Sequence, residues 1–314
     1  MNRNTNLIFT LFATIKKSFC FLLTWRSLPL YELISYVFMF SGISMLAHGS
    51  GSYTTGELRV VVLTLLSLYS GFFAALIWND ITDAEIDAVV HPDRPIPSLK
   101  ISSKIFFSVG LFFSFLTFLF SFFVNIYFFG IVLLLAVFVA VHNKYLKTTI
   151  SLPAFSEIFT PFQWSMVPVL GYLSFQRFDF FSIMILTLFT YFAVSSHDII
   201  DGIHDQKGDK RKGVQTYVIS FGVNTAVSIA FIWFVISGIF GFLIYVFTPV
   251  RLFFLLIFSF LYFYTLFHYY KLIHIDRKHI EKESLRYGRI GYNYFIFTFV
   301  IIFFDLIIQM LFLN

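Results

Sequence analysis

Residues 58–87 read LRVVVLTLLSLYSGFFAALIWNDITDAEID. The first part, residues 58–78, carries a single charge, Arg59, and has the length of about 20 residues that a helix needs to cross a bilayer. The second part brings Asp80, Asp83, Glu85 and Asp87 together directly after the apolar run. The stretch therefore predicts a membrane-spanning helix that ends in an acidic cluster.

The composition of the whole chain agrees with this prediction. Of its 314 residues, 58% are hydrophobic, 22% are aromatic and only 12% are charged, whereas soluble domains average about 25% charged residues. These values predict an integral membrane protein that has the lipid bilayer as its surroundings. The net charge of +5 is typical of cytoplasmic loops in such proteins, so we expect neither nucleic acid nor an obligatory protein partner.

Nine apolar stretches are long enough to cross the membrane, which predicts an all-α fold with nine transmembrane helices. They are residues 28–47, 58–78, 105–124, 126–141, 154–173, 180–200, 223–247, 252–270 and 292–312. Residues 1–27, where Lys16 and Lys17 interrupt an apolar run, are predicted to form an N-terminal interfacial segment. Residues 28–314 are predicted to form one transmembrane domain.

The distribution of basic residues predicts the orientation of the chain. Only Arg59, Arg177 and Arg251 fall on one side of the nine-span arrangement, and the other 19 of the 22 Lys and Arg residues fall on the opposite side. Lys and Arg are enriched in cytoplasmic loops. We therefore expect the N-terminus and the charged loops at 79–104, 201–222 and 271–291 to lie in the cytoplasm, together with any active site.

Two acidic clusters with helical spacing indicate a cation site. Asp80, Asp83 and Asp87 would share one face if the helix continued past residue 78. Asp198, Asp201, Asp205 and Asp209 repeat this spacing at the end of the sixth span. Acids at a membrane boundary are costly and tend to mark functional sites, and oxygen ligands suit Mg²⁺, which commonly bridges carboxylates to phosphates. Two facing clusters predict two or more Mg²⁺ ions around one diphosphate.

A proline-rich turn and two histidine pairs lie close to these clusters. The sequence His91-Pro92-Asp93-Arg94-Pro95-Ile96-Pro97 predicts a stiff turn in which the Arg94 guanidinium binds phosphate oxygens. The pairs His197-Asp198 and His204-Asp205 place their histidines two helical turns apart, too far for one zinc ion without other ligands.

The two acidic segments resemble the two signatures of the UbiA superfamily of intramembrane prenyltransferases. The first is Asn79-Asp80-x-x-Asp83-x-x-x-Asp87 followed by Pro92-Asp93-Arg94-Pro95-Ile96-Pro97-Ser98, and its form is most similar to the branch that makes archaeal digeranylgeranylglyceryl phosphate. The second is Asp205-x-x-Gly208-Asp209-x-x-x-Gly213-x-x-Thr216. The resemblance covers nearly the whole chain and implies a helical bundle whose cytoplasmic mouth binds Mg²⁺ and an isoprenoid diphosphate.

The resemblance also implies roles for individual residues. The implied metal ligands are Asn79, Asp80, Asp83, Asp87, Asp205 and Asp209. Asp83, Asp205 and Arg94 are the residues expected to be essential for catalysis, and Asn79, Arg94, Lys147 and Asp201 are expected to bind the diphosphate. Tyr69 and Trp164 are aromatic residues that would stabilise an allylic cation without being alkylated by it.

The second signature departs from the family pattern, and this leaves two reactions open. An expected upstream Arg is His197, and Asp201-Gly202 stands where a basic residue followed by an aspartate is usual. The cation could be captured by a lipophilic acceptor of the aromatic or glycerol-phosphate type, as in a prenyltransferase. Alternatively, it could be captured by its own distant double bond, as in a UbiA-type terpene cyclase.

Two other membrane functions fit the sequence less well. The segment Asp198-x-x-Asp201-Gly202 begins like the motif of CDP-alcohol phosphotransferases, but Asp205-Gln206 stands where that motif requires Ala-Arg. An ion-coupled transporter would favour acids near the middle of the membrane, whereas these acids gather at one interface.

Overall fold

The structure is a computed structural model that describes residues 28–49 and 51–312, and these residues form helices and loops without strands. The predicted interfacial segment 1–27 lies outside the described residues. The long helices are α2 (Leu30–His48), α3 (Thr55–Thr82), α5 (Ser103–Val124), α6 (Ile126–Val141), α8 (Phe155–Ser174), α9 (Phe180–Lys212), α11 (Val223–Phe247), α12 (Leu252–Leu272) and α13 (Arg277–Phe312). Short elements are α4 (Ala84–Val90), a π-helical turn (His142–Leu146), α7 (Lys147–Thr149) and α10 (Tyr217–Phe221).

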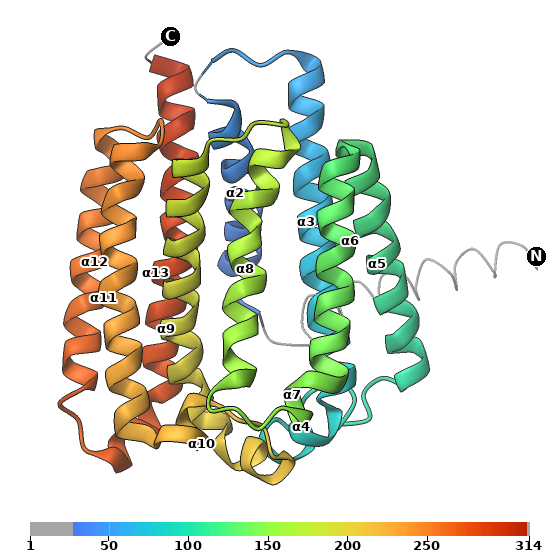
Figure 1. The fold of residues 1–314 in the computed structure, drawn as a ribbon, viewed down its shortest axis with the longest axis vertical. Coiled ribbons are helices and arrows are strands. Elements are labelled where there is room, and N and C mark those ends of the chain that lie inside the picture. The colour runs from blue at the N-terminus through green and yellow to red at the C-terminus, as the bar shows by residue number, and fades with distance from the viewer. Residues whose placement is uncertain (1–27, 50, 313–314) are drawn as a thin grey trace, which may run out of the picture.

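Eight segments of the described chain are long and apolar enough to cross a membrane, so the protein is a multi-pass integral membrane protein. They correspond to all of the predicted spans except residues 154–173. That span forms helix α8, which runs alongside the others in the bundle (Figure 1) but does not belong to the eight. Glu157, Gln163 and two prolines, Pro161 and Pro168, make it more polar than its neighbours. The all-helical membrane fold is confirmed, and the ninth crossing stays a prediction.

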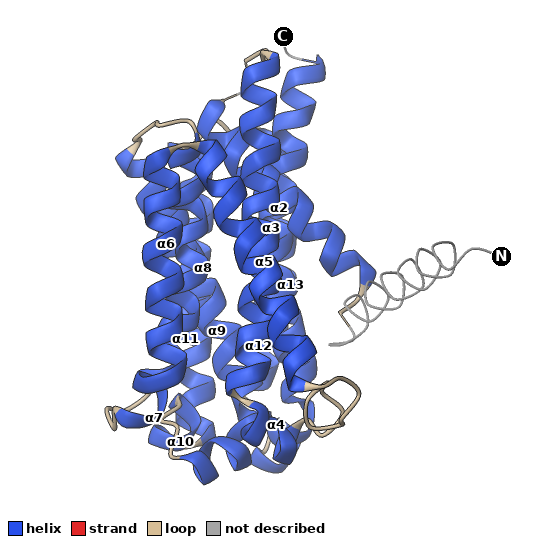
Figure 2. Ribbon diagram, turned by 90° about the vertical axis from the view of Figure 1, so that its right-hand side faces the viewer, coloured by secondary structure: helices blue, strands red, loops and turns tan. Residues whose placement is uncertain are grey.

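Helix α9 lies at the centre of the bundle. It packs against α11, α13 and α8, while α2 fills the space between α13, α8 and α3. Helices α3, α5 and α6 form the opposite side of the bundle (Figure 1). The short helices α4, α7 and α10 gather at one end, as both views show (Figures 1 and 2). This end collects the loops that follow α3, α6 and α9.

Polar caps begin and end several of these helices. Thr54 and Glu57 form a reciprocal capping box at the start of α3, and Asn125 accepts a hydrogen bond from the Phe128 amide at the start of α6. Helix α9 ends at Gly213, whose φ of 73° lies in the left-handed region that glycine adopts without strain.

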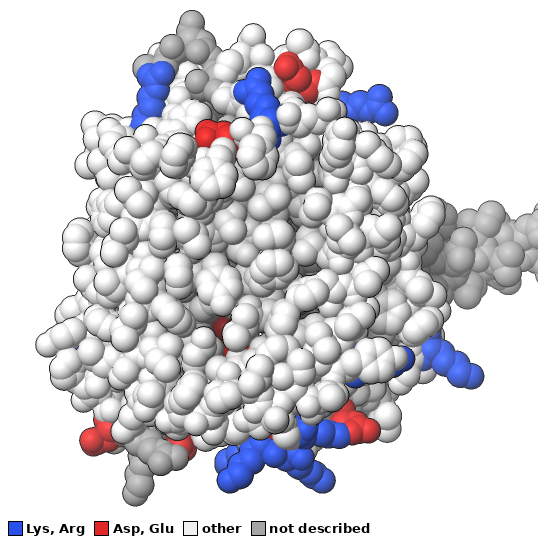
Figure 3. All heavy atoms as spheres, in the orientation of Figure 1, with Lys and Arg blue, Asp and Glu red and all other residues white. Residues whose placement is uncertain are grey.

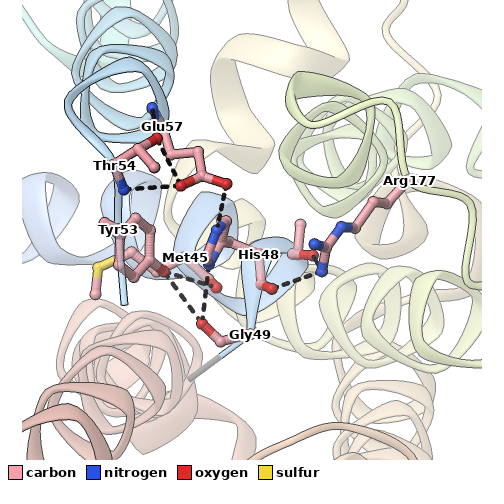
Figure 4. A network of polar contacts seen from close by, with 8 residues as sticks. Met45, His48, Gly49, Tyr53, Thr54, Glu57 and Arg177 are labelled. Atoms are coloured by element: carbon pink, nitrogen blue, oxygen red, sulfur yellow. Dashed lines mark hydrogen bonds and ion pairs between the residues drawn. The ribbon is translucent and has the colours of Figure 1, made fainter. Parts of the chain in front are cut away.

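A polar network holds the opposite end of the bundle together (Figure 4). His48 Nε2 lies 2.9 Å from Glu57 Oε1, which links the end of α2 to the start of α3. Arg177, in the loop after α8, donates to the His48 carbonyl at 2.6 Å. Tyr53 donates to the Met45 carbonyl at 3.2 Å. These contacts fix α2, α3 and α8 relative to one another.

The charged segments that were expected to be loops are largely helical. Helix α3 continues to Thr82, α9 to Lys212, and α13 begins at Arg277. The helices therefore extend beyond the apolar spans, and hydropathy alone does not mark their ends. On the face shown in Figure 3, a broad and almost uncharged belt separates the Lys, Arg, Asp and Glu residues at the two ends of the molecule.

Candidate active site

The first acidic cluster lies where α3 gives way to α4. Asp83 follows the last residue of α3 and precedes the first residue of α4, and its amide donates to the Asn79 carbonyl at 2.8 Å. Asp80, Asp83 and Asp87 are all buried, with exposures of 1%, 8% and 2%. Three buried carboxylates this close in the chain repel one another unless cations accompany them. Asn79 is half-buried beside them.

Arg94 supplies one of these cations. Its Nη1 lies 2.5 Å from Asp87 Oδ1 and 3.6 Å from Asp80 Oδ1. The turn that carries Arg94 is fixed by its own hydrogen bonds, since the Arg94 amide donates to the His91 carbonyl at 3.0 Å and Ser98 Oγ donates to the Arg94 carbonyl at 2.6 Å. Burial raises the pKa of Asp87 above its usual range, and the hydrogen bond from Arg94 opposes that rise.

Lys147 supplies the second cation from the other side. It begins α7, directly after the π-helical turn, and its Nζ donates to Asp83 Oδ2 at 2.8 Å. Asp209 on α9 is only 8% exposed, and α9 packs against α4, which begins directly after Asp83. Lys147 therefore brings a positive charge to the end of the bundle where the first cluster meets α9.

The acids of α9 divide into two groups. Asp205 Oδ1 lies 3.1 Å from Nε2 of His91 in the proline-rich turn that follows the first cluster, and Asp209 lies one helical turn further along α9. Asp198 and Asp201 instead accompany His197, whose Nδ1 lies 3.3 Å from Asp198 Oδ1 and 3.9 Å from Asp201 Oδ2.

Asp201 packs against α13, because a Cβ atom at Gly288 would lie 1.7 Å from its Oδ1. The two signatures thus approach each other through Asp205 and Asp209, while Asp201 points toward α13.

Sequence reasoning missed Glu157, in the first turn of α8. The Tyr217 amide donates to its Oε2, and a Cβ atom at Gly202 would lie 2.6 Å from its Oε1. Gly202 lies on α9 between Asp198 and Asp205, so the Glu157 carboxylate lies beside the acidic part of that helix. Glu157 is the one acid of the predicted span 154–173, and an isolated acid in a membrane segment is the signal that could have found it.

The aromatic residues chosen from the sequence belong to a cluster deeper in the bundle. Trp164 stacks on Tyr36, with ring centroids 5.7 Å apart and an interplanar angle of 11°, and meets Phe295 edge-on at 5.5 Å. Phe72 lies 4.2 Å from Tyr36 between ring centroids. Tyr69 meets Phe73 edge-on at 5.3 Å and lies about 16 Å along the α3 axis from Asp80.

The aromatic cluster connects to the acidic end through two residues. The Tyr292 ring lies 5.3 Å from the ring of His197, and the Tyr292 hydroxyl hydrogen-bonds to that of Tyr36. A path of side chains therefore leads from Asp201 and His197 to Trp164. Aromatic side chains therefore pack together in the bundle beyond the acids.

The donor set fits a hard divalent cation. The acids offer carboxylate oxygens, and the buried Asp87 Oδ2 has no hydrogen-bond partner within the described part of the chain. A buried carboxylate oxygen left in this way is costly unless a cation or water binds it. The residues that would hold Mg²⁺ are Asp80, Asp83, Asp87, Asp205 and Asp209, with Asn79 beside them.

The protein is a bundle of apolar helices with two acidic clusters at one end. This arrangement is typical of membrane-embedded proteins that bind cations at the membrane surface. The chain matches the model of the UbiA prenyltransferase family over residues 35–298, and it belongs to that family.

Relatives and solved structures agree with this assignment. The chain is 31% identical over 184 residues to a digeranylgeranylglyceryl phosphate synthase from Saccharolobus solfataricus, a match that covers 55% of this chain and 61% of that protein. The chain thus spans about three fifths of the length of the curated relatives it matches.

Two UbiA homologues of known structure share the fold. The apo structure from Aeropyrum pernix K1 superimposes with a TM-score of 0.69 at 14% identity, covering 90% of this chain and 100% of that one. The homologue from Archaeoglobus fulgidus bound to DMAPP and Mg²⁺ gives a TM-score of 0.57 at 16% identity, covering 87% and 97%.

Proposed function

We propose that the protein is a Mg²⁺-dependent intramembrane prenyltransferase that ionises an isoprenoid diphosphate and transfers its prenyl group to a lipophilic acceptor. The observation that carries this proposal is the ion pair of Lys147 with Asp83 of the first cluster, at the end of the bundle where α4 packs against α9. A diphosphate held between two acidic helix ends needs cations from both sides, and this lysine lies where the two ends meet.

Several residues contribute to the departure of the diphosphate leaving group. Mg²⁺ bound by the acids would neutralise the diphosphate as the allylic C–O bond breaks and its electron pair moves onto oxygen. Lys147 and Arg94 contribute fixed positive charge at the same place. Arg94 keeps Asp80 and Asp87 in position for the cation, and its guanidinium presents further N–H donors for phosphate oxygens.

The aromatic cluster would receive the hydrocarbon chain and the allylic cation. The faces of Trp164, Tyr36 and Phe72 offer negative electrostatic potential without a strong nucleophile, and each such contact contributes up to about 2 kcal/mol when water is excluded. The path from His197 through Tyr292 to this cluster supports a prenyl chain that extends from the acids into the bundle.

For the acceptor, the names of the relatives favour a glycerol-phosphate type, because the curated matches are digeranylgeranylglyceryl phosphate synthases. A second candidate is cyclisation of geranylgeranyl diphosphate without an acceptor. The dense ring lining around Trp164 and Tyr36 favours it, because a folded chain needs cation stabilisation at several points.

The distribution of Lys and Arg supports a cytoplasmic N-terminus and a cytoplasmic active site in a nine-span arrangement. The end with α4, α7 and α10 would then face the cytoplasm.

The experiment that tests the proposal supplies purified protein with Mg²⁺ and labelled geranylgeranyl diphosphate, first alone and then with a prenylated glycerol phosphate or an aromatic acid. Diphosphate and the organic extract are measured together. Release that requires an acceptor supports transfer and names the acceptor class. Release with a cyclic product and no acceptor identifies a cyclase. Absence of Mg²⁺-dependent diphosphate release under all three conditions contradicts both.

A further inference from the structure

A histidine from the proline-rich turn meets the second acidic cluster. His91 Nε2 lies 3.1 Å from Asp205 Oδ1, and the two residues are 114 positions apart in the chain. The backbone of His91 is fixed on both sides, since its amide donates to the Asp87 carbonyl at 2.7 Å and its carbonyl accepts from the Arg94 amide at 3.0 Å. The imidazole is therefore presented to α9 by a rigid turn.

A second histidine completes a group of three. His204 precedes Asp205 on α9, and its ring centroid lies 5.6 Å from that of His91. One ligand atom from each of His91, His204 and Asp205 lies within 4.8 Å of the other two. His204 is exposed and the other two are half-exposed, so an ion in solution can reach all three.

We propose that His91, His204 and Asp205 bind one divalent transition-metal ion, of the Co²⁺ or Zn²⁺ type. Two imidazoles and one carboxylate are a common set of protein ligands for such ions, with water in the remaining position. Metal–ligand bonds of about 2.1 Å place neighbouring ligand atoms roughly 3.0–3.5 Å apart. His91 and Asp205 already have this separation, and the exposed His204 ring can rotate to join them.

The chemistry of this group differs from that of the oxygen-only acids on α3 and α4. Imidazole nitrogen favours Co²⁺ and Zn²⁺ over Mg²⁺. The surroundings also favour a cation, because Asp209 lies one turn from Asp205 on the same face of α9. Among the described residues, the ion-pair partner of Asp205 is His91 and not a lysine or arginine.

The sequence alone did not predict this site. His197 and His204 are the histidines that helical spacing relates to each other, and they lie two turns apart. His91 comes from another segment and supplies the ligand that the local pattern lacked. Occupancy would clamp the turn that carries Arg94 to α9. The bound ion would also compete with Mg²⁺ for Asp205. The inference rests on the proposed function only for this competition.

The test uses the full chain in detergent, stripped of metal with a chelator and without substrate. Co²⁺ is titrated in while its visible absorption is followed, Zn²⁺ is then added as a competitor, and bound metal is counted by elemental analysis. The variants are His91→Asn and His204→Asn. The matched control is His274→Asn, which changes an exposed histidine in the turn before α13 whose Nδ1 lies 2.8 Å from the Tyr270 carbonyl oxygen.

We expect one Co²⁺ per chain to give an absorption spectrum typical of nitrogen ligands, which Zn²⁺ abolishes, whereas Co²⁺ on the carboxylates of the Mg²⁺ site binds without that spectrum. Each site variant should weaken binding by at least about tenfold, since even the loss of an outer partner of a metal ligand costs that much. The control should bind as the original protein does. Equal affinity and an unchanged spectrum in both site variants would overturn the inference, as would the absence of any saturable binding. Thermal unfolding without metal checks that each variant is folded.

The outcome is distinguishable from that of the proposed function. If Co²⁺ binds as described but no diphosphate is released from any substrate, the metal site stands and the prenyltransferase proposal fails. If diphosphate release depends on Mg²⁺ while Co²⁺ binding is insensitive to both histidines, the prenyltransferase proposal stands and the metal site fails.

Discussion

Lys147 Nζ lies 2.8 Å from Asp83 Oδ2, which joins the residue after the π-helical turn to the junction of α3 and α4. The two side chains are 19% and 12% exposed, so most of this ion pair is shielded from water. A π-helical turn is frequently found at functional sites, because it changes the direction in which the following residues point. Here the turn at His142–Leu146 precedes the lysine that lies between the two acidic clusters.

Asp83→Ala and Asp205→Ala should each abolish turnover while the fold is retained. Each change removes a carboxylate expected to hold Mg²⁺, and we expect a loss of at least about a hundredfold in kcat for Mg²⁺-dependent diphosphate release. The control is Asp276→Ala, an exposed acid in the turn before α13. Near-normal Mg²⁺-dependent activity in either site variant would show that its cluster is not part of the active site.

Arg94→Ala should make the stability of the protein depend more strongly on Mg²⁺. The change leaves Asp80 and Asp87 buried without their guanidinium partner, and loss of one partner of a buried ion pair costs about 3–5 kcal/mol. A bound divalent cation would offset part of that cost. The measurement is Tm with and without Mg²⁺, compared with the unchanged protein. A Mg²⁺-induced shift in Tm no larger than that of the original protein would contradict a cation site at these acids.

Much of the fold was predictable from the sequence, because spans of about 20 apolar residues have few alternatives in a membrane. The ends of the helices were not predictable in this way. The segments at 79–82 and 201–212 are polar enough to resemble loops, yet they continue α3 and α9 because they pack against other elements at the end of the bundle. Hydropathy identifies the residues that lie in the membrane, but it does not locate the ends of the helices.

The candidate site was predictable where its residues share a local pattern. Asp80, Asp83 and Asp87 stand at helical spacing, and all three are buried together. Glu157 and His91 were missed because each stands alone in its own segment and joins the acids of α9 only through tertiary packing. Helical spacing likewise grouped Asp201 with Asp205, although Asp201 packs against Gly288 on α13.

Gly202→Ala should displace the Glu157 carboxylate. A Cβ atom at Gly202 would lie 2.6 Å from Glu157 Oε1, so the carboxylate must move, and we expect this to weaken the hydrogen bond that its Oε2 accepts from the Tyr217 amide. We expect a loss of about 1–3 kcal/mol in the free energy of unfolding, since the hydrogen bond of a partly buried donor is weakened. The comparison variant is Gly130→Ala in α6, where nothing lies within 4 Å of the added atom.

A double-mutant cycle separates this contact from other effects of the new methyl group. In a Glu157→Ala background, Gly202→Ala should cost nothing, or stabilise the protein by up to about 1 kcal/mol through the better helix propensity of alanine. Equal costs in the two backgrounds, measured by denaturant unfolding, would place the strain elsewhere than at Glu157.

Trp164→Leu should slow diphosphate release more than it destabilises the fold, whereas Trp164→Phe should retain most of the rate. The indole stacks on Tyr36 at 5.7 Å and is half-buried beside Phe72, and the proposed function assigns this group of rings to stabilising the allylic cation. Loss of one desolvated cation–π contact of about 2 kcal/mol corresponds to a decrease of roughly thirtyfold in rate. The measurement is kcat at saturating geranylgeranyl diphosphate, together with Tm. Trp233→Leu on α11 is the comparison variant, since its ring packs on Phe192 at 5.1 Å rather than on Tyr36 or Phe72. If both leucine variants lower Tm alike and leave kcat unchanged, the rings around Trp164 serve packing alone, and the allylic cation must be stabilised by other groups.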